Sequence, residues 1–520
     1  MSESGDTSRD KSHLEVARGA GIAGAGVLWE IGVRLASILL VPRILGAANY
    51  GVFGFAMRVA EIGRRVSSAG LYDGVMRYVA IHESRKDWAR LRGAIFFASK
   101  IILGLGLLLA LVILLFAPWI AVNSFQEGSD GGAGSEEIEG VIRAVAIAAP
   151  LVAFLTLLVR ALRGMRRVGA ATAVFSIFLP TARLALVLGL FALGFGILGV
   201  AWAVVVSSFA ACLLAIRALH QAIPLWGKDT PAIVEKKEFL SFSIPLVGVD
   251  IFSFLALNAD FFILAWYASQ EDAGIYNAVI RLMLILTLPL TLVQTLLTPM
   301  SASLSGEGRL DELRFLYRTA TRWIFTSMVP IVLVVLLFSD VFLGVVGADY
   351  MEGGDSLALL AATLLLAGFA NPAGYAVTMS GRSGITLLNS VLCFLTTVGV
   401  ALWLIPEFGI FGAAGARAAS LLVNNALTLV QGKWILGLNP FSLALLKPIL
   451  AGAVACSVGW WALDADWLGQ SPLDALMGSI AVAGIFLGVL LALGLGAEDK
   501  EVLAAARNSI RRRLGRGGKP

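Results

Sequence analysis

The sequence predicts an all-α polytopic membrane protein with about 14 transmembrane helices, and composition, run length and charge placement support this. Of the 520 residues, 58% are hydrophobic and only 14% are charged, and the mean hydropathy is +0.85. A helix that crosses a bilayer needs roughly 20 apolar residues. A chain this apolar is neither a soluble enzyme, nor a nucleic-acid binding protein, nor a secreted disulfide-linked domain.

Apolar runs of span length recur along the whole chain and set its predicted organisation. They start near residues 19, 50, 94, 141, 170, 197, 239, 275, 323, 356, 385, 409, 448 and 475. The expected parts are a cytoplasmic lead (1–18), an N-lobe of spans one to six (19–220), a cytoplasmic linker (221–238), a C-lobe of spans seven to twelve (239–437), two additional spans (438–496) and a basic cytoplasmic tail (497–520).

Charge placement predicts the orientation. The loops expected outside the cell contain 14 acidic residues and no lysine or arginine, whereas 29 of the 40 basic residues fall in the opposite loops and the termini. Cytoplasmic loops of membrane proteins carry an excess of lysine and arginine. We therefore expect a multi-pass protein of the cytoplasmic membrane with both termini in the cytoplasm.

Other chemistry is not indicated. The cysteines, Cys212, Cys393 and Cys456, all lie in apolar runs, as inert buried thiols do. The three histidines are far apart in sequence, and the chain contains no phosphate-binding loop motif. We expect no metal centre, no ATP hydrolysis by this chain and no bound cofactor, apart from a coupling Na⁺ or H⁺.

Two pairs of similar segments indicate an internal duplication. Residues 51–59 resemble residues 274–282, in that Gly51-Val52-Phe53 matches Gly274-Ile275-Tyr276. Residues 195–201 resemble residues 408–414 in the same order. All four segments open a span from the outer face, so the halves run parallel, as in transporters built from repeats. A six-plus-six repeat with two appended spans follows.

Several short motifs on this frame give the chain a family resemblance. They are Leu45-Gly46 with Tyr50-Gly51, Gly70-Leu71 with Arg77, Pro245 with Asp260, and the segment 274–278, Gly-Ile-Tyr-Asn-Ala. Over nearly its whole length the chain resembles the polysaccharide flippases of the multidrug/oligosaccharidyl-lipid/polysaccharide (MOP) superfamily. The resemblance implies two lobes around a central cavity that opens to each side alternately and carries lipid-linked sugars.

Eleven basic residues remain at membrane depth after the loops and termini are assigned. Several of them lie near span ends and can reach the membrane surface, but six arginines cannot be explained in this way. At roughly 3 kcal/mol each at the centre of a span, six arginines facing lipid would cost about 18 kcal/mol, which exceeds the ~5–15 kcal/mol stability of typical folded proteins. They must therefore face water, acids or a ligand. The predicted substrate-binding residues are Arg34, Arg58, Arg65, Arg183, Arg281 and Arg417.

The duplication pairs two of these arginines. Arg58 and Arg281 each follow a matched glycine by seven residues, so both are expected roughly 10 Å below the outer end of equivalent helices. A guanidinium offers paired donors and keeps its charge when partly desolvated. We expect the two arginines to bind the phosphate or diphosphate of a polyprenyl-linked sugar from opposite lobes.

Salt bridges within the bundle are the alternative for these arginines. Glu30 and Arg34 are spaced i,i+4, and Arg58, Glu61 and Arg65 form one stripe. Because only four carboxylates accompany the six arginines, two positive charges are left over. Those carboxylates, Glu30, Glu61, Asp250 and Asp260, are also the predicted sites for a coupling proton or Na⁺, although Asp260 equally suits a helix-packing role.

The sequence thus predicts a flippase that moves an anionic polyprenyl-phosphate-linked oligosaccharide by alternating access for cell-surface glycan assembly. It is predicted to be a transporter and not an enzyme. Expected partners are the lipid-linked substrate, membrane lipids and a glycan polymerase or glycosyltransferases, with no nucleic acid. Two alternatives stay open. A cation-coupled multidrug exporter of the same superfamily would need an acid-rich cavity, and an integral membrane glycosyltransferase or polymerase would need a large outer loop with catalytic acids.

Overall fold

The computed structural model describes residues 4–126, 132–223, 233–234, 236–379, 383–440, 443–465 and 471–494. The predicted tail (497–520) and most of the predicted linker (221–238) lie outside these residues. The predicted lead (1–18) is described only as the helical backbone of residues 4–18.

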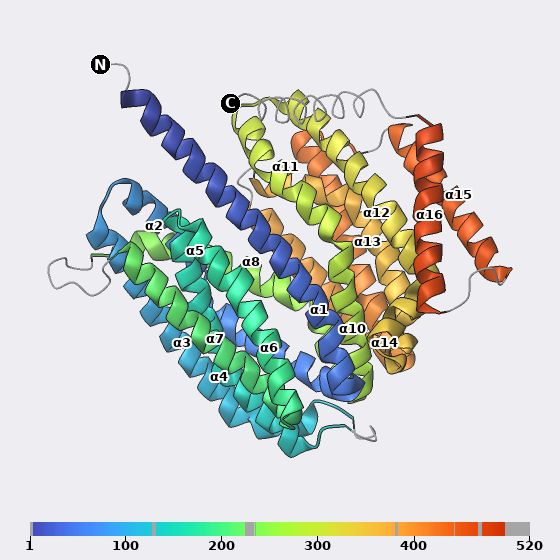
Figure 1. Cartoon of the computed structure of the whole chain (residues 1–520), viewed down its shortest axis with the longest axis horizontal. Coiled ribbons are helices and arrows are strands. Elements are labelled where there is room, and N and C mark those ends of the chain that lie inside the picture. Colours follow the sequence, from blue (N-terminus) through green and yellow to red (C-terminus); the bar gives the residue numbers. More distant parts are fainter. Residues whose placement is uncertain are drawn as a thin grey trace, which may run out of the picture. The chain divides into compact units, whose positions relative to one another are not determined.

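Every regular element in these ranges is a helix (Figure 1), which confirms the predicted all-α class. The elements of the first half are α1 (Ser4–Ser68), α2 (Leu71–Ser84), α3 (Trp88–Asn123), α4 (Ser135–Gly164), α5 (Val168–Thr172), the π-helix η1 (Ala173–Phe178), α6 (Leu179–Ala192), α7 (Gly196–Ala222), α8 (Lys236–Ala256) and α9 (Ala259–Tyr267). The remaining elements are α10 (Gln270–Leu286), α11 (Leu288–Gly306), α12 (Leu310–Val346), η2 (Ala348–Gly353), α13 (Gly354–Met379), α14 (Ser383–Leu436), η3 (Leu443–Leu445), α15 (Leu446–Asp464) and α16 (Pro472–Ala492).

Ten helices in the described part of the chain are long and apolar enough to cross a bilayer, or eleven if the bent pair α8–α9 counts as one span. Two of them, α1 and α14, each cover two predicted runs. A glycine with a non-helical backbone separates the two runs within each helix: Gly46 has φ 72° and Gly409 has φ 49°. The predicted number of fourteen counts these segments separately and is therefore approximate.

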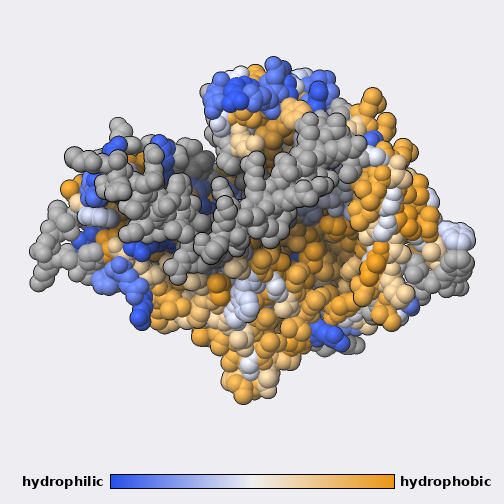
Figure 2. Space-filling model, turned by 45° about the horizontal axis from the view of Figure 1, so that its top comes forward, coloured by the Kyte–Doolittle hydropathy of each residue, from blue (hydrophilic) through white to orange (hydrophobic). Residues whose placement is uncertain are grey.

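The surface of the helices is apolar, as a lipid environment requires. On α3 the side chains of Leu107, Leu111 and Leu115 are all exposed. Figure 2 shows hydrophobic side chains over much of the described surface, with hydrophilic side chains gathered in separate patches. In water, contiguous exposed apolar surface of this kind would mark an aggregation site, so the helices are built to face acyl chains.

The chain divides into two compact units. The first contains residues 1–278 and 401–413, and the second contains residues 279–400 and 414–520. In the first unit α4 packs against α1, α3 and α7, around a core that includes Leu91, Leu155 and Leu162. In the second unit α12 packs against α13, α15 and α16, with Phe325 and Phe486 in one of its cores.

The matched glycines of the first repeat motif meet each other inside the first unit. A methyl group at residue 51 would lie 2.0 Å from the carbonyl oxygen of Gln270, and one at residue 274 would lie 1.8 Å from the carbonyl oxygen of Ala47. Each glycine therefore contacts the carbonyl four residues before its counterpart. Reciprocal contacts of this kind are the signature of a two-fold relation, and they support the duplication inferred from the sequence.

The second motif repeats in backbone conformation. Gly196 and Gly409 occupy matched positions and adopt φ values of 55° and 49°. A side chain in this left-handed region meets the following carbonyl oxygen, whereas glycine adopts the region freely. Both copies thus have, at the matched position, a glycine with a positive φ.

Gly196→Ala is expected to lower the free energy of unfolding by about 1–2 kcal/mol, the cost of a left-handed alanine. A methyl group there would meet only Glu137 Oε1, at 3.9 Å, so backbone conformation alone causes the loss. Thermal unfolding of the purified protein in detergent measures the effect. Gly189→Ala, in the middle of α6, has nothing within 4 Å and a helical φ, and should not destabilise; equal losses in both variants would contradict the explanation.

Candidate functional site: a basic pocket in the first unit

The first unit contains a polar pocket of about 650 Å³ between α1, α2, α4, η1, α6 and α8. The charged residues that line it are four arginines and three carboxylates, which leaves one positive charge in excess. They are Arg64, Arg65, Arg160, Arg183, Glu61, Asp73 and Asp250.

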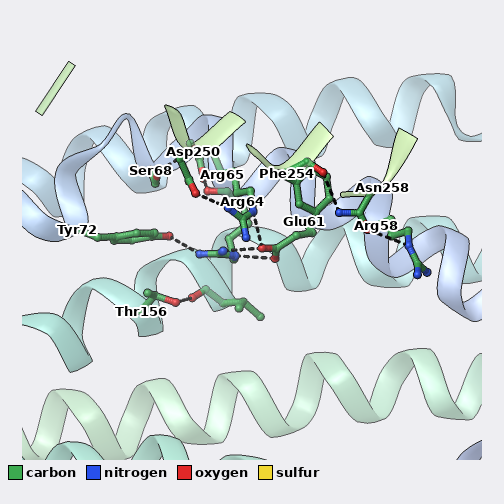
Figure 3. Close-up of polar contacts among 12 residues, drawn as sticks. Arg58, Glu61, Arg64, Arg65, Ser68, Tyr72, Thr156, Asp250, Phe254 and Asn258 are labelled. Carbon is green, nitrogen blue, oxygen red and sulfur yellow. Dashed lines mark hydrogen bonds and ion pairs between the residues drawn. The ribbon is translucent and has the colours of Figure 1, made fainter. Parts of the chain in front are cut away.

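One turn of α1 places three of these charges together. Helical neighbours are spaced i,i+3 and i,i+4, so Glu61 reaches both Arg64 and Arg65. Arg64 binds Glu61 in a bidentate fork, with Nε to Oε2 at 2.6 Å and Nη2 to Oε1 at 2.5 Å. Arg65 Nε donates to Glu61 Oε1 at 2.9 Å. A single carboxylate thus orients two guanidinium groups in the pocket (Figure 3).

Arg65 also connects α1 to α8. Its Nη1 donates to Asp250, and its guanidinium carbon lies 4.9 Å from the centre of the Phe254 ring. The side chain of Asp250 is 42% exposed, against 25% for Arg65. Asp250 is therefore the more exposed partner of this ion pair. A cation or a competing anion from water can reach the pair from that side.

The break after α1 brings α2 to the pocket. Ala69 and Gly70 have φ values of 44° and 68°, and this left-handed turn places the first residues of α2 beside α1. Arg64 Nη1 lies 3.4 Å from the hydroxyl oxygen of Tyr72. The next residue, Asp73, is 3.1 Å from Arg160 of α4. This second ion pair is also open, since the Asp73 side chain is 60% exposed.

Arg183 reaches the pocket from α6, directly after the π-helix η1. A π-helical turn shifts the register of the following helix, and such turns are frequent at functional sites. Arg183 donates from Nε to Ser207 Oγ at 3.4 Å and from Nη2 to Ser208 Oγ at 3.3 Å, both on α7. Both of these acceptors are neutral hydroxyls, and they orient the guanidinium.

The charges that line the pocket suit an anion. Guanidinium groups form paired, charge-assisted hydrogen bonds with phosphate or carboxylate oxygens, and here they come from three different helices. The most exposed carboxylates, Asp73 and Asp250, each hold one arginine. A phosphate entering the pocket can replace them as the partner of Arg160 and Arg65 without leaving any charge buried alone.

The structure brings together four of the ten residues predicted from the sequence: Glu61, Arg65, Arg183 and Asp250. Arg34 and Glu30 lie elsewhere on α1 and pair with each other at 2.6 Å, with the arginine side chain 59% exposed. The i,i+4 spacing indicated this salt bridge as the alternative to ligand binding. Arg34 forms it at the surface of α1.

Arg58 lies in a separate cluster of the first unit and is 8% exposed. It donates to Asn258 at 3.1 Å, and to Asn277 and the Gly54 carbonyl at 3.0 Å each. Its guanidinium carbon is 3.6 Å from the centre of the Phe261 ring. The stripe of Arg58, Glu61 and Arg65 expected on α1 is therefore divided, because Arg58 contacts α9 and α10 while the other two line the pocket.

Asp260 is fully buried at the start of α9. It accepts a hydrogen bond from the hydroxyl of Tyr276, which also lies 3.1 Å from the Ala413 carbonyl. These contacts tie α9 and α10 to the segment 401–413 and agree with the helix-packing role. A coupling role for Asp260 stays a prediction.

Arg281 and Arg417 belong to the second unit, on α10 and α14, and both are half-buried. The predicted phosphate bridge between Arg58 and Arg281, and the role of Arg417, stay predictions.

Residues 16–305 match the family model for polysaccharide biosynthesis proteins, a region that contains every residue lining the pocket. The chain belongs to this family. A segment of 154 residues is 27% identical to the lipid III flippase of Escherichia coli (strain K12), and equally to that of Shigella flexneri. The alignment covers 29% of this chain and only 34% of each flippase.

Solved structures show the same fold. The lipid II flippase MurJ in an inward closed conformation aligns with a TM-score of 0.71 at 13% identity, covering 90% of this chain and 97% of MurJ. An inward-facing multidrug resistance MATE family transporter of the MOP superfamily aligns with a TM-score of 0.61 at 16% identity, covering 78% and 98%. The chain is thus a multi-pass membrane protein of the polysaccharide biosynthesis family with the MOP fold.

Three of the charged residues that line the pocket were not predicted from the sequence: Arg64, Arg160 and Asp73. The charge pattern of the sequence places Arg64 near a span end and Arg160 in a cytoplasmic loop. One signal was available, since Arg64 follows Glu61 by three residues, the spacing of a helical ion pair. The pairing of Arg160 with Asp73 depends on how α2 folds back, which no local pattern specifies.

Proposed function

We propose that this chain is a flippase that moves an anionic lipid-linked oligosaccharide across the cytoplasmic membrane by alternating access, and that it is a transporter and not an enzyme. The observation that carries the proposal is the pocket of the first unit, which is lined by four arginines against three carboxylates. The names of the flippases to which the chain is similar support the same substrate class.

In this proposal the phosphate of the substrate binds among Arg64, Arg65, Arg160 and Arg183. Glu61 keeps Arg64 and Arg65 oriented, and the phosphate replaces Asp73 and Asp250 at the open ion pairs. Binding then costs little desolvation, because the arginines exchange one anionic partner for another.

The replacement of Asp250 by phosphate also offers a mechanism for ion coupling. When phosphate displaces Asp250 from Arg65, the freed carboxylate can take up a proton or Na⁺, and it releases the ion when Arg65 returns. Glu61 keeps its two arginines throughout. We therefore favour Asp250 over Glu30, Glu61 and Asp260 as the coupling carboxylate.

Orientation follows from charge. We propose that both termini are cytoplasmic, which puts the end of α1 at Ser68, the start of α2 and the pocket beside them in the cytoplasmic half of the membrane. The substrate would load there from the inner leaflet. A glycosyltransferase that completes the lipid-linked sugar and a polymerase that consumes it outside are the proposed partners.

Replacing the pocket arginines should slow flipping. Arg160→Gln/Arg183→Gln removes two charge-assisted donors, each contributing about 1.5–3 kcal/mol when bound to a charged group, so the transport rate at low substrate should fall by a factor of at least about 100. Vesicles containing the purified protein and a fluorescent lipid-linked sugar measure the rate, through the fraction of label that becomes accessible to a quencher.

The matched control is Arg143→Gln. Arg143 lies on α4 like Arg160, is 52% exposed and pairs with Glu139, and it does not line the pocket. Its loss should leave flipping unchanged. Equal rates for the wild type and the double variant, with both proteins folded, would refute the pocket as the phosphate site.

The fold shared with MATE transporters favours one second candidate, a cation-coupled multidrug exporter. A cationic drug would need a net acidic pocket, and the excess here is positive. Efflux of a cationic dye from cells, abolished by Asp250→Asn, together with no flipping of lipid-linked sugar, would establish the exporter instead.

A further inference from the structure

The second unit contains another pocket, of about 340 Å³, formed by α12, α15 and α16. All three helices are candidate spans, and they share a core that includes Phe325, Val329, Ala451 and Phe486. The pocket is thus held between transmembrane helices, and it shares no lining residue with the basic pocket of the first unit.

Its charge is positive. Arg322 of α12 and Lys447 of α15 line the pocket, and none of the described lining residues is acidic. Arg322 is only 8% exposed. Lys447 Nζ donates to the carbonyl oxygen of Gly494, just past the end of α16, at 2.6 Å. An ammonium group has three donors, so Lys447 keeps donors for a ligand while this contact fixes its position.

The rest of the pocket is apolar and opens along α16. Phe486, Leu487 and Leu490 line it from that helix, and Pro330 and Pro448 line it from the other two. The Leu487 side chain is 54% exposed. Pro330 cannot donate a backbone hydrogen bond, so the carbonyl four residues earlier, at Thr326, loses its usual helical partner. That carbonyl is an acceptor for a ligand hydroxyl.

Helix ends place the pocket at one surface of the membrane. Lys447 is the second residue of α15, and Gly494 follows the last residue of α16 by two. Arg322 lies in the first half of α12, next to the exposed indole of Trp323. Tryptophan is enriched at the level of lipid headgroups. In the proposed orientation these helix ends face the cytoplasm, so the pocket lies at the inner leaflet.

From this arrangement we propose that the pocket binds an anionic glycerophospholipid of the inner leaflet. The phosphate lies between Arg322 and Lys447, the glycerol hydroxyls of the headgroup reach the Thr326 carbonyl and the Ser327 hydroxyl, and one acyl chain runs along Leu487 and Leu490. Charge complementarity sets the preference, since basic pockets between transmembrane helices on the cytoplasmic side suit anionic headgroups. The bound lipid fastens α15 and α16 to α12.

Native mass spectrometry of the full chain in detergent, titrated with phosphatidylglycerol or phosphatidylcholine, tests the proposal. Wild type should bind phosphatidylglycerol more tightly. Arg322→Gln/Lys447→Gln should weaken phosphatidylglycerol binding by about 30-fold, from about 1 kcal/mol for each basic residue near the membrane surface, and should leave phosphatidylcholine binding nearly unchanged. Arg318→Gln, an exposed arginine one turn earlier on α12, is the matched control and should behave as wild type.

Two further variants keep the result interpretable. Arg322→Lys retains the charge and should retain most of the binding, even if Arg322→Gln proves unstable. Leu487→Trp fills the apolar part without changing charge and should weaken binding of phosphatidylglycerol. The proposal is wrong if the double variant binds phosphatidylglycerol like the wild type, if soluble glycerol phosphate competes as well as the lipid, or if only a polyprenyl phosphate binds.

Discussion

Gly274→Ala is expected to prevent the first unit from folding stably. A methyl group at this position would lie 1.8 Å from the carbonyl oxygen of Ala47 and 2.6 Å from its carbonyl carbon. Both neighbours are backbone, so no rotamer change can relieve the overlap and α1 must move away from α10. Overpacking costs typically 1–3 kcal/mol and more where the backbone has to shift, so we expect a loss of at least about 3 kcal/mol.

Thermal unfolding of purified protein, followed by size-exclusion chromatography with fluorescence detection, measures this loss. Gly51→Ala should behave alike, since its methyl group would lie 2.0 Å from the Gln270 carbonyl oxygen. Gly104→Ala on α3 is the control. It has nothing within 4 Å, and replacing a glycine by alanine inside a helix stabilises by up to about 1 kcal/mol. A melting temperature of Gly274→Ala equal to that of the wild type would contradict the close approach.

The repeat was predictable from sequence because its two copies keep glycine where the backbone requires it. Gly196 and Gly409 sit in left-handed turns, and Gly51 and Gly274 sit where helices touch through main-chain atoms. The contact itself was not predictable. A single sequence does not indicate which backbone each of two matched glycines will contact. Each could equally well contact a helix of its own half.

The sequence predicted that charged residues would gather in a site, but it identified only some of the residues that form it. Counting charges at membrane depth identified Arg65, Arg183, Glu61 and Asp250, which the structure brings to one pocket. The same count could not separate them from Arg34, whose partner is on its own helix. The difference depends on the face of α1 to which each side chain belongs and on the helices that pack against that face. Both are set by tertiary structure.

Arg160 was not predicted as a pocket residue because the boundary between span and loop was placed before it. Arg160 was counted with a cytoplasmic run of arginines, yet α4 continues to Gly164 and carries it into the pocket beside Asp73. Hydropathy reports the average of a window, so a charged residue in the last turns of a long helix is scored with the loop. The last turns of long helices are therefore where pocket residues are hardest to predict from sequence.

Arg58→Ala is expected to destabilise the protein by about 3–5 kcal/mol, because each buried acceptor that loses its donor costs about 1–3 kcal/mol and the cation–π contact is lost as well. The truncation leaves the Asn258 and Asn277 side-chain oxygens without this donor and removes the contact with Phe261. Asn258 occupies the break between α8 and α9, where its Nδ2 also donates to the Phe254 carbonyl at 2.9 Å. Arg58 therefore fixes the bend of that span and its attachment to α1.

Comparing stability with substrate binding decides between this packing role and the phosphate role predicted from the repeat. Packing predicts that Arg58→Ala lowers the melting temperature by roughly 3–5 °C and that Arg58→Lys recovers only part of it, because an ammonium lacks the planar fork. Arg34→Ala, which loses an exposed i,i+4 pair, should change stability by less than about 0.5 kcal/mol. If Arg58→Ala instead melts like the wild type and loses binding of the lipid-linked sugar, Arg58 is a phosphate ligand after all. The Asn258 and Asn277 contacts would then belong to a state that the substrate disrupts.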